Sequence, residues 1–128
     1  MFIRFNPNPK RKIIDDCVIR AISTVTGKTW EQVNTDLFLI ALREGDYQWK
    51  NYIWGSYLEK LGFTQHLIPN TCPNCFTVRD FCKLFPEGIY ILAIGDHVVA
   101  VIDSNYFDTW DSGDEVPVYY WKKENFTT

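Results

Sequence analysis

Apolar residues recur at helical spacing in the first two thirds of the chain, and most of these stretches are bounded by residues typical of helix ends. The pattern predicts a helix over residues 17–26, with Asp16 as N-cap and Gly27 just past its end. Further helices are predicted from the cap residue Thr29 to near Gly45, over about 50–61, and over 77–84 with Thr77 as cap.

The last third of the chain has the continuous and alternating apolar runs that are typical of strands. Strands are predicted over residues 89–94, 97–103, 106–111 and 116–121, with a short strand over 63–68. Helices come first and an antiparallel meander comes last. This segregation predicts an α+β fold in which N-terminal helices pack on a C-terminal antiparallel β-sheet.

Length and composition narrow the class of protein. The 128 residues suffice for a single domain, 1–128, and an aromatic content of 16% argues against a disordered chain. The net charge of −3 argues against a nucleic-acid partner, and the basic run over 10–12 is interpreted as solvated surface. The sequence contains no apolar segment resembling a signal peptide or a membrane span, so we expect a cytoplasmic protein without a membrane partner.

Cys17 is the first candidate for chemistry. It follows the predicted cap Asp16 directly, so it falls in the first turn of a helix. Backbone N–H groups and the helix dipole favour an anion at that position, which would stabilise a nucleophilic thiolate. The alternative is that Cys17 is a small apolar residue packed on an amphipathic helix.

A general base for this thiol must come from one of two histidines. His97 opens a predicted strand directly after a Gly-Asp turn, at the rim of the sheet. His66 lies inside a short strand, where a packed or exposed structural histidine is the simpler interpretation. We therefore expect His97 to be the base.

The acid that orients His97 can be chosen from hairpin register. A three-residue loop over 103–105 would place His97 opposite Asp111 on one face, with Cβ atoms about 5 Å apart. The same register places Asp108 opposite Ala100, on the other face. Asp111 is therefore the predicted third member of a triad and Asp108 the fallback. The alternatives are a solvated acidic strand edge or a calcium site, although the spacing is not that of an EF-hand.

Two further residues lie close to these positions in the sequence. Arg20, one turn after Cys17, is expected to pair structurally with Asp16 or Asp80; alternatively it favours the thiolate or binds a substrate carboxylate. Trp110 either packs over the site or belongs to the core.

The remaining cysteines include one C-x-x-C pair. In a reducing cytoplasm the cysteines are expected to be thiols, metal ligands or catalysts rather than disulfides. Cys72, Cys75, Cys82 and His66 could form a Cys₃His zinc site, but their spacings are irregular and a single C-x-x-C pair is weak evidence. We expect a turn with two incidental thiols, and no metal or other cofactor.

Several segments resemble one family. They are residues 6–9 (NPNP), 16–21 (DCVIRA), 77–81 (TVRDF), 88–101 and 108–112 (DTWDS). Across residues 6–121 the chain is similar to small papain-like cysteine proteases encoded by bacteria and phages. The resemblance implies a papain-like fold, with Cys17 as nucleophile, His97 as base and Asp111 as third member.

The sequence departs from this family where the oxyanion hole is completed. Papain-like proteases usually carry Gln about six residues before the cysteine, and Arg11 stands there in this chain. Asn8 is the candidate substitute, or else Asn6. Loss of such a donor costs roughly 10²–10³ in rate.

These residues together predict acyl transfer through a thioester on a protein or peptide substrate. Peptide or isopeptide hydrolysis by a thiol protease is the expected reaction, and deamidation or transamidation of a protein glutamine would use the same residues. The competing interpretations are a non-catalytic papain-like binding module and an interaction domain stabilised by zinc.

Overall fold

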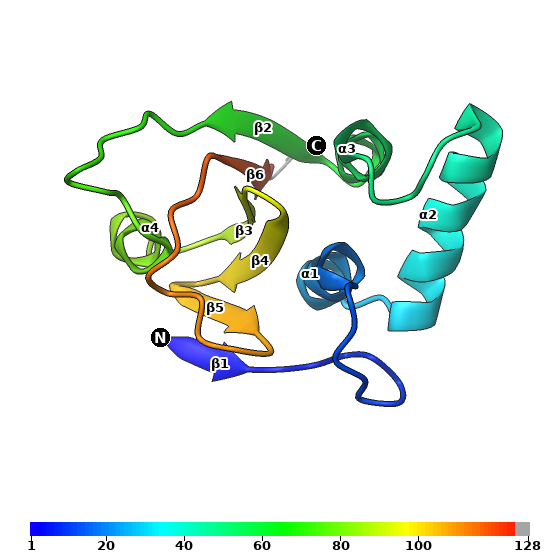
Figure 1. The fold of residues 1–128 in the computed structure, drawn as a ribbon, viewed down its shortest axis with the longest axis horizontal. Helices are drawn as coiled ribbons and strands as arrows, with labels where there is room; N and C mark the ends of the chain where they lie inside the picture. The colour runs from blue at the N-terminus through cyan, green and yellow to red at the C-terminus, as the bar shows by residue number, and fades with distance from the viewer. Residues whose placement is uncertain (125–128) are drawn as a thin grey trace.

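A computed structural model describes residues 1–124 of the chain (Figure 1). Its elements, in chain order, are β1 (Phe2–Arg4), α1 (Cys17–Thr26), α2 (Trp30–Glu44), α3 (Asn51–Lys60), β2 (Phe63–Leu67), α4 (Val78–Leu84), β3 (Ile89–Ile94), β4 (His97–Ile102), β5 (Asn105–Asp108) and β6 (Tyr119–Lys123). The fold is α+β, as the segregation of helical and strand patterns predicts.

Local signals place the helix ends where the sequence predicts them. Helix α1 ends at Gly27, whose φ of 74° is in the left-handed region that favours glycine. The Thr29 hydroxyl accepts the backbone N–H of Gln32 at the start of α2. At the start of α4, Thr77 and Asp80 form a reciprocal capping box.

The sheet differs from the predicted antiparallel meander. Within residues 1–124 its strand order is β1-β5-β4-β3-β6-β2, and β1 runs parallel to β5. Only β3, β4 and β5 follow one another as a meander, because β6 returns to the other side of β3 and pairs there with β2 as well. The prediction missed β1, whose three residues are too few to show a periodic pattern.

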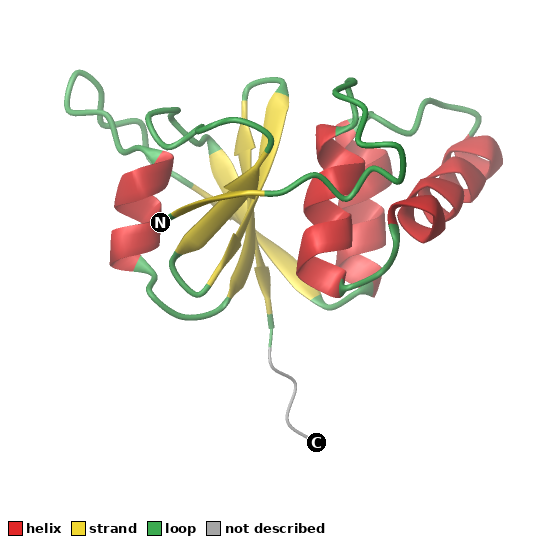
Figure 2. Cartoon of the chain, turned by 90° about the horizontal axis from the view of Figure 1, so that it is seen from below, coloured by secondary structure: helices red, strands yellow, loops and turns green. Residues whose placement is uncertain are grey.

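Both faces of the sheet are covered. Helices α1, α2 and α3 lie on one face and α4 lies on the other (Figure 2). Alternate residues of the central strands therefore enter two different cores: Ile91, Val98 and Ala100 pack against the three helices, whereas Leu92, Val99 and Val101 pack with α4. This double burial explains why β3 and β4 are continuous apolar runs rather than alternating ones.

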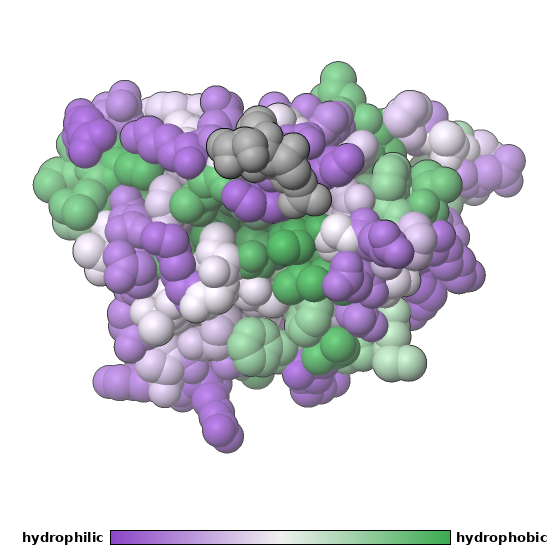
Figure 3. Space-filling view, turned by 180° about the vertical axis from the view of Figure 1, so that it is seen from behind, coloured by the Kyte–Doolittle hydropathy of each residue, from purple (hydrophilic) through white to green (hydrophobic). Residues whose placement is uncertain are grey.

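The same packing sets up a site at one end of the central strands of the sheet. Helix α1 packs directly on β4, so the first residue of α1 lies near the first residue of β4. The face seen from behind the view of Figure 1 has an apolar area near its centre (Figure 3). Among residues 1–124, every helix is too short or too polar to cross a bilayer.

The capping box gives a test of the fold. Thr77→Ala removes the hydroxyl that accepts the Asp80 N–H, so we expect the free energy of unfolding to fall by about 1 kcal/mol. Urea denaturation followed by circular dichroism measures the change. Thr77→Ser keeps the hydroxyl and serves as the matched control; equal losses in the two variants would contradict the assignment.

Candidate active site

Cys17 stands at an unusual helix N-terminus. The N-cap residue Asp16 makes no side-chain capping bond, because its buried carboxylate is occupied elsewhere. It accepts hydrogen bonds from Arg20, from Trp30 Nε1 at 2.9 Å and from Asn8 Nδ2 at 3.3 Å. Within the described residues, the first-turn N–H groups of α1 therefore have no side-chain cap, and they are available to an anion beside the Cys17 thiol.

His97 is oriented by Asp108. Its Nε2 lies 2.6 Å from Asp108 Oδ2, and its ring packs against Trp110 with a centroid distance of 5.2 Å. The imidazole side chain is only 17% exposed. Because Asp108 occupies Nε2, the other ring nitrogen, Nδ1, is left for the thiol.

The protonation of His97 follows from these partners. Burial of the imidazole lowers the pKa of His97, but hydrogen bonds to Asp108 and to Cys17 outweigh this effect, and the pKa is raised from 6.5 to about 9. The imidazolium form of His97 is therefore favoured at neutral pH. An imidazolium beside the thiol is what a thiolate nucleophile requires as its partner.

Asp108 is held by several donors. Its side chain is 2% exposed, and its oxygens accept from Ser112 Oγ and from the Thr109 N–H, each at 2.8 Å. Arg20 Nη2 lies 3.7 Å from Asp108 Oδ1. A buried carboxylate with these partners stays fixed in position.

The prediction that Asp111 orients His97 is wrong. The Asp111 side chain is 48% exposed and accepts hydrogen bonds from Tyr106 Oη at 2.5 Å and from the Gly113 N–H at 3.0 Å. Arg79 lies 3.4 Å away on the same carboxylate. The Tyr106 hydrogen bond is the main cause of the lowered pKa of Asp111. Asp111 thus belongs to a separate surface cluster, and the fallback Asp108 takes the predicted place.

The physical reason for this correction is the length of one loop. Asp103 and Ser104 form a two-residue turn with φ of 46° and 73°, and Ile102 pairs with Asn105. The prediction assumed three loop residues. A one-residue change in register moves every side chain of a strand to the opposite face, so Asp108, and not Asp111, shares the face of His97.

Asn8 does not take the predicted oxyanion role. Its Oδ1 accepts the backbone N–H groups of Lys10 and Lys12, and its Nδ2 donates to Asp16. Asn6, the second candidate, donates to the Lys12 carbonyl. Both side chains therefore hold the loop before α1 in shape, and Asn8 acts on the site through the position of Asp16.

Arg20 makes the expected structural pair with Asp16. The alternative partner, Asp80, is used in the α4 capping box. The prediction missed the second contact of Arg20, with Asp108. No signal within the sequence could have found it, because it joins a helix to a strand that lies 88 residues later in the chain.

The possible zinc set does not assemble. Cys72 and Cys75 form a disulfide, which corrects the expectation of free thiols. Cys82 is buried in α4, where desolvation raises the pKa of its thiol. His66 contacts Thr64 and Glu124. Among residues 1–124, no group of His, Cys, Asp or Glu side chains is arranged to hold a metal ion.

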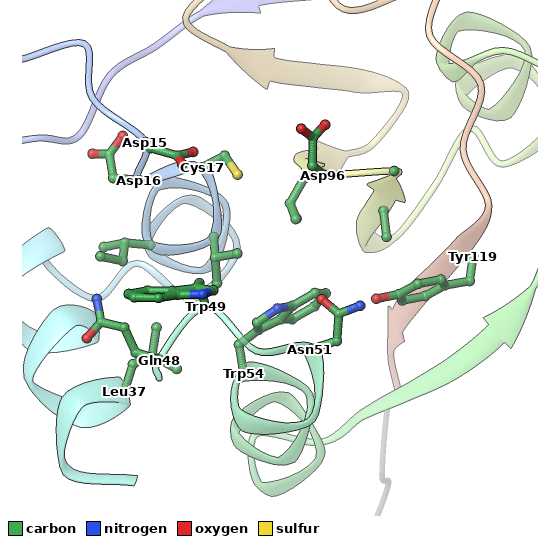
Figure 4. Close-up of a pocket in the computed structure, with 15 residues that line it drawn as sticks. Asp15, Asp16, Cys17, Leu37, Gln48, Trp49, Asn51, Trp54, Asp96 and Tyr119 are labelled. Carbon is green, nitrogen blue, oxygen red and sulfur yellow. The ribbon is translucent and has the colours of Figure 1, made fainter. Parts of the chain in front are cut away.

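A cavity of about 590 Å³ adjoins Cys17. Its walls come from the start of α1, the α2–α3 connection, the β3–β4 turn and β6 (Figure 4). Trp49, Trp54 and Tyr119 supply aromatic surface, and Asp15 and Asp96 supply carboxylates. A cavity of this size beside a thiol can hold a side chain of a substrate bound at Cys17.

Comparison of the chain with protein-family models, with curated proteins and with solved structures finds no match. The function of the chain is therefore inferred from the geometry of its site.

The ionisation of His97 is directly testable by proton NMR. We expect its ring proton to titrate near pH 9, because its pKa is raised to about 9. Asp108→Asn removes the carboxylate and should lower that value. Asp111→Asn is the matched control and should leave it in place; the reverse result would restore Asp111 as the partner of His97.

The same shift predicts how stability depends on pH. Folding favours protonated His97, so its contribution is fully present below the ordinary pKa of 6.5 and is lost as the pH rises through about 9. Urea midpoints measured across this interval should fall more steeply for the wild type than for His97→Gln. Parallel curves for the two proteins would show that the folded state does not raise the pKa of His97.

Proposed function

We propose that this protein is a cysteine-dependent acyl-transfer enzyme of the papain-like kind that hydrolyses a peptide or isopeptide bond. The observation that carries the proposal is the pairing of His97 with buried Asp108 beside Cys17 at an uncapped helix N-terminus. The chain order Cys17, His97, Asp108 and the placement of the base and acid on adjacent antiparallel strands support the papain-like assignment.

In the first half of the reaction, the Cys17 thiolate attacks the substrate carbonyl carbon and forms a C–S bond. The negative charge that develops on the carbonyl oxygen is stabilised by first-turn N–H groups of α1, in place of the missing glutamine. Collapse of this intermediate breaks the C–N bond. His97 imidazolium gives its proton to the departing amine, and a thioester remains on Cys17.

In the second half, neutral His97 accepts a proton from water as the water oxygen attacks the thioester. The C–S bond then breaks, which releases the acid and restores the Cys17 thiolate beside the His97 imidazolium. Asp108 keeps Nε2 occupied throughout, so that Nδ1 carries the proton between the thiol and the leaving group. Trp110 covers one side of the imidazole and limits its contact with water. With ammonia as leaving group the same steps deamidate glutamine, and with an amine acceptor they give transamidation.

The reactivity of Cys17 tests this proposal. We expect iodoacetamide to alkylate Cys17 at about pH 6, because the His97 imidazolium stabilises the thiolate, and His97→Ala to lower that rate by at least about tenfold. Peptide mapping measures the rate at each cysteine. Buried Cys82 is the internal reference. Cys17 that is inert, or equally reactive in His97→Ala, would overturn the proposal.

A second readout separates catalysis from mere reactivity. Treatment with p-nitrophenyl acetate should acetylate Cys17, and mass spectrometry should then show the acetyl group leaving in the wild type. In Asp108→Asn both steps should slow by about 10²-fold or more, because the imidazole is no longer oriented, whereas Asp111→Asn should match the wild type. A stable acetyl-Cys17 in the wild type would favour the non-catalytic binding module.

A further inference from the structure

We propose that the cavity beside Cys17 binds a positively charged peptide side chain, arginine or lysine, so that the enzyme acts next to a basic residue. This inference rests on the proposed function, since it names the substrate class of the same site. Three features of the cavity carry it: two exposed carboxylates at its rim, aromatic side chains along its wall, and the position of the wall relative to the thiol.

The charged residues that line the cavity are all acidic. Asp15 and Asp96 are exposed and lie on opposite sides of Cys17 in the labelled view (Figure 4). Among residues 1–124 neither of them forms an ion pair, whereas the carboxylate of Asp16 is neutralised by Arg20. Of the described residues that line the cavity, none is Lys, Arg or His. Two exposed carboxylates therefore lie at the rim of the cavity, and among the described lining residues no cationic side chain accompanies them.

The wall supplies a surface suited to such a cation. Trp54 and Tyr119 stack with a centroid distance of 6.5 Å and an interplanar angle of 13°. Trp49, held by stacking on Tyr47 at 4.5 Å, is 63% exposed, and its ring borders the same cavity. Tryptophan faces attract ammonium and guanidinium groups, and they also pack well against an aliphatic stem.

These features select among possible occupants. An acidic side chain would be repelled by Asp15 and Asp96. A purely apolar side chain would remove water from both carboxylates without replacing the lost hydrogen bonds. An arginine or lysine side chain can lay its stem on the exposed face of Trp49 and bring its charged end to either carboxylate.

The position of the cavity relative to Cys17 and His97 determines which substrate residue can occupy it. The cavity borders Cys17, Gly95 and Val98, but His97, on the alternate face of β4, does not line it within the described chain. The scissile carbonyl must lie between Cys17 and His97. The cation in the cavity therefore belongs to a side chain that flanks the reacting bond.

The local charge can be tested without any turnover. Two methanethiosulfonate reagents, one carrying a trimethylammonium group and one a sulfonate, are compared in their rates of reaction with Cys17, each normalised to its rate with free cysteine. In this reaction the Cys17 sulfur forms a disulfide with the reagent, and methanesulfinate leaves. We expect the normalised rate to favour the cation by about tenfold.

Matched variants assign this preference to the cavity. Asp15→Asn and Asp96→Asn should each reduce the preference about twofold to threefold, and the double variant should abolish it. Glu87→Gln removes an exposed charge from the α4 side of the sheet and should change nothing. A normalised ratio near one in the wild type, or a ratio unaffected by the double variant, would overturn the inference. Slow reaction with both reagents would count against the proposed function instead.

The preference for a cationic side chain can also be tested by measuring peptide binding. Cys17→Ala protein is titrated with acetyl-Ala-Arg-Ala-amide and with the same peptide containing citrulline, which keeps the shape of arginine but not its charge. Tryptophan fluorescence measures the binding of each peptide. We expect the arginine peptide to bind about tenfold more tightly than the citrulline peptide. Trp49→Ala should remove most of this difference in affinity. Equal binding of the two peptides, or binding of neither, would overturn the inference.

Discussion

The site depends on one buried arrangement of charges. Arg20 lies between two carboxylates that are far apart in the sequence, with Asp16 at the start of α1 and Asp108 at the end of β5. All three side chains are buried, so each charge would be costly without the others. The attraction of Arg20 to both carboxylates holds the first turn of α1 against the strand that carries the partner of His97. The placement of Cys17 relative to His97 thus depends on this buried cluster.

Asp16 illustrates how a local role can be exchanged for a tertiary one. As an N-cap it could have bonded to its own helix, which is the usual function of aspartate at that position. Instead its carboxylate joins the preceding loop through Asn8, its own helix through Arg20 and the next helix through Trp30. The helix N-terminus beside Cys17 is left open as a result. An uncapped helix end is unfavourable in isolation, and here it coincides with the point where the proposed reaction develops negative charge.

The cavity and the proposed catalytic residues use side chains from opposite faces of β4. Val98 faces the three helices and borders the cavity, whereas His97 follows the other parity and reaches Asp108. Because Cys17 is the first residue of α1 and lies where the helix meets the strand, it borders both the cavity and His97. This geometry separates the groups that would perform chemistry from the groups that would recognise a side chain, so each set can be altered independently.

Periodicity and neighbours within one helical turn were enough to predict the helices, their caps, the α+β class and the candidates Cys17 and His97. Three features became apparent only in the folded chain: the pairing of Asp108 with His97, the place of β1 in the sheet, and the hydrogen bonds of Asn8 within its loop. The choice of acid depended on whether one turn contained two residues or three, and this difference exchanges the faces of a strand. The partners of buried carboxylates depend on segments brought together from distant parts of the chain, and local sequence patterns carry no information about such contacts.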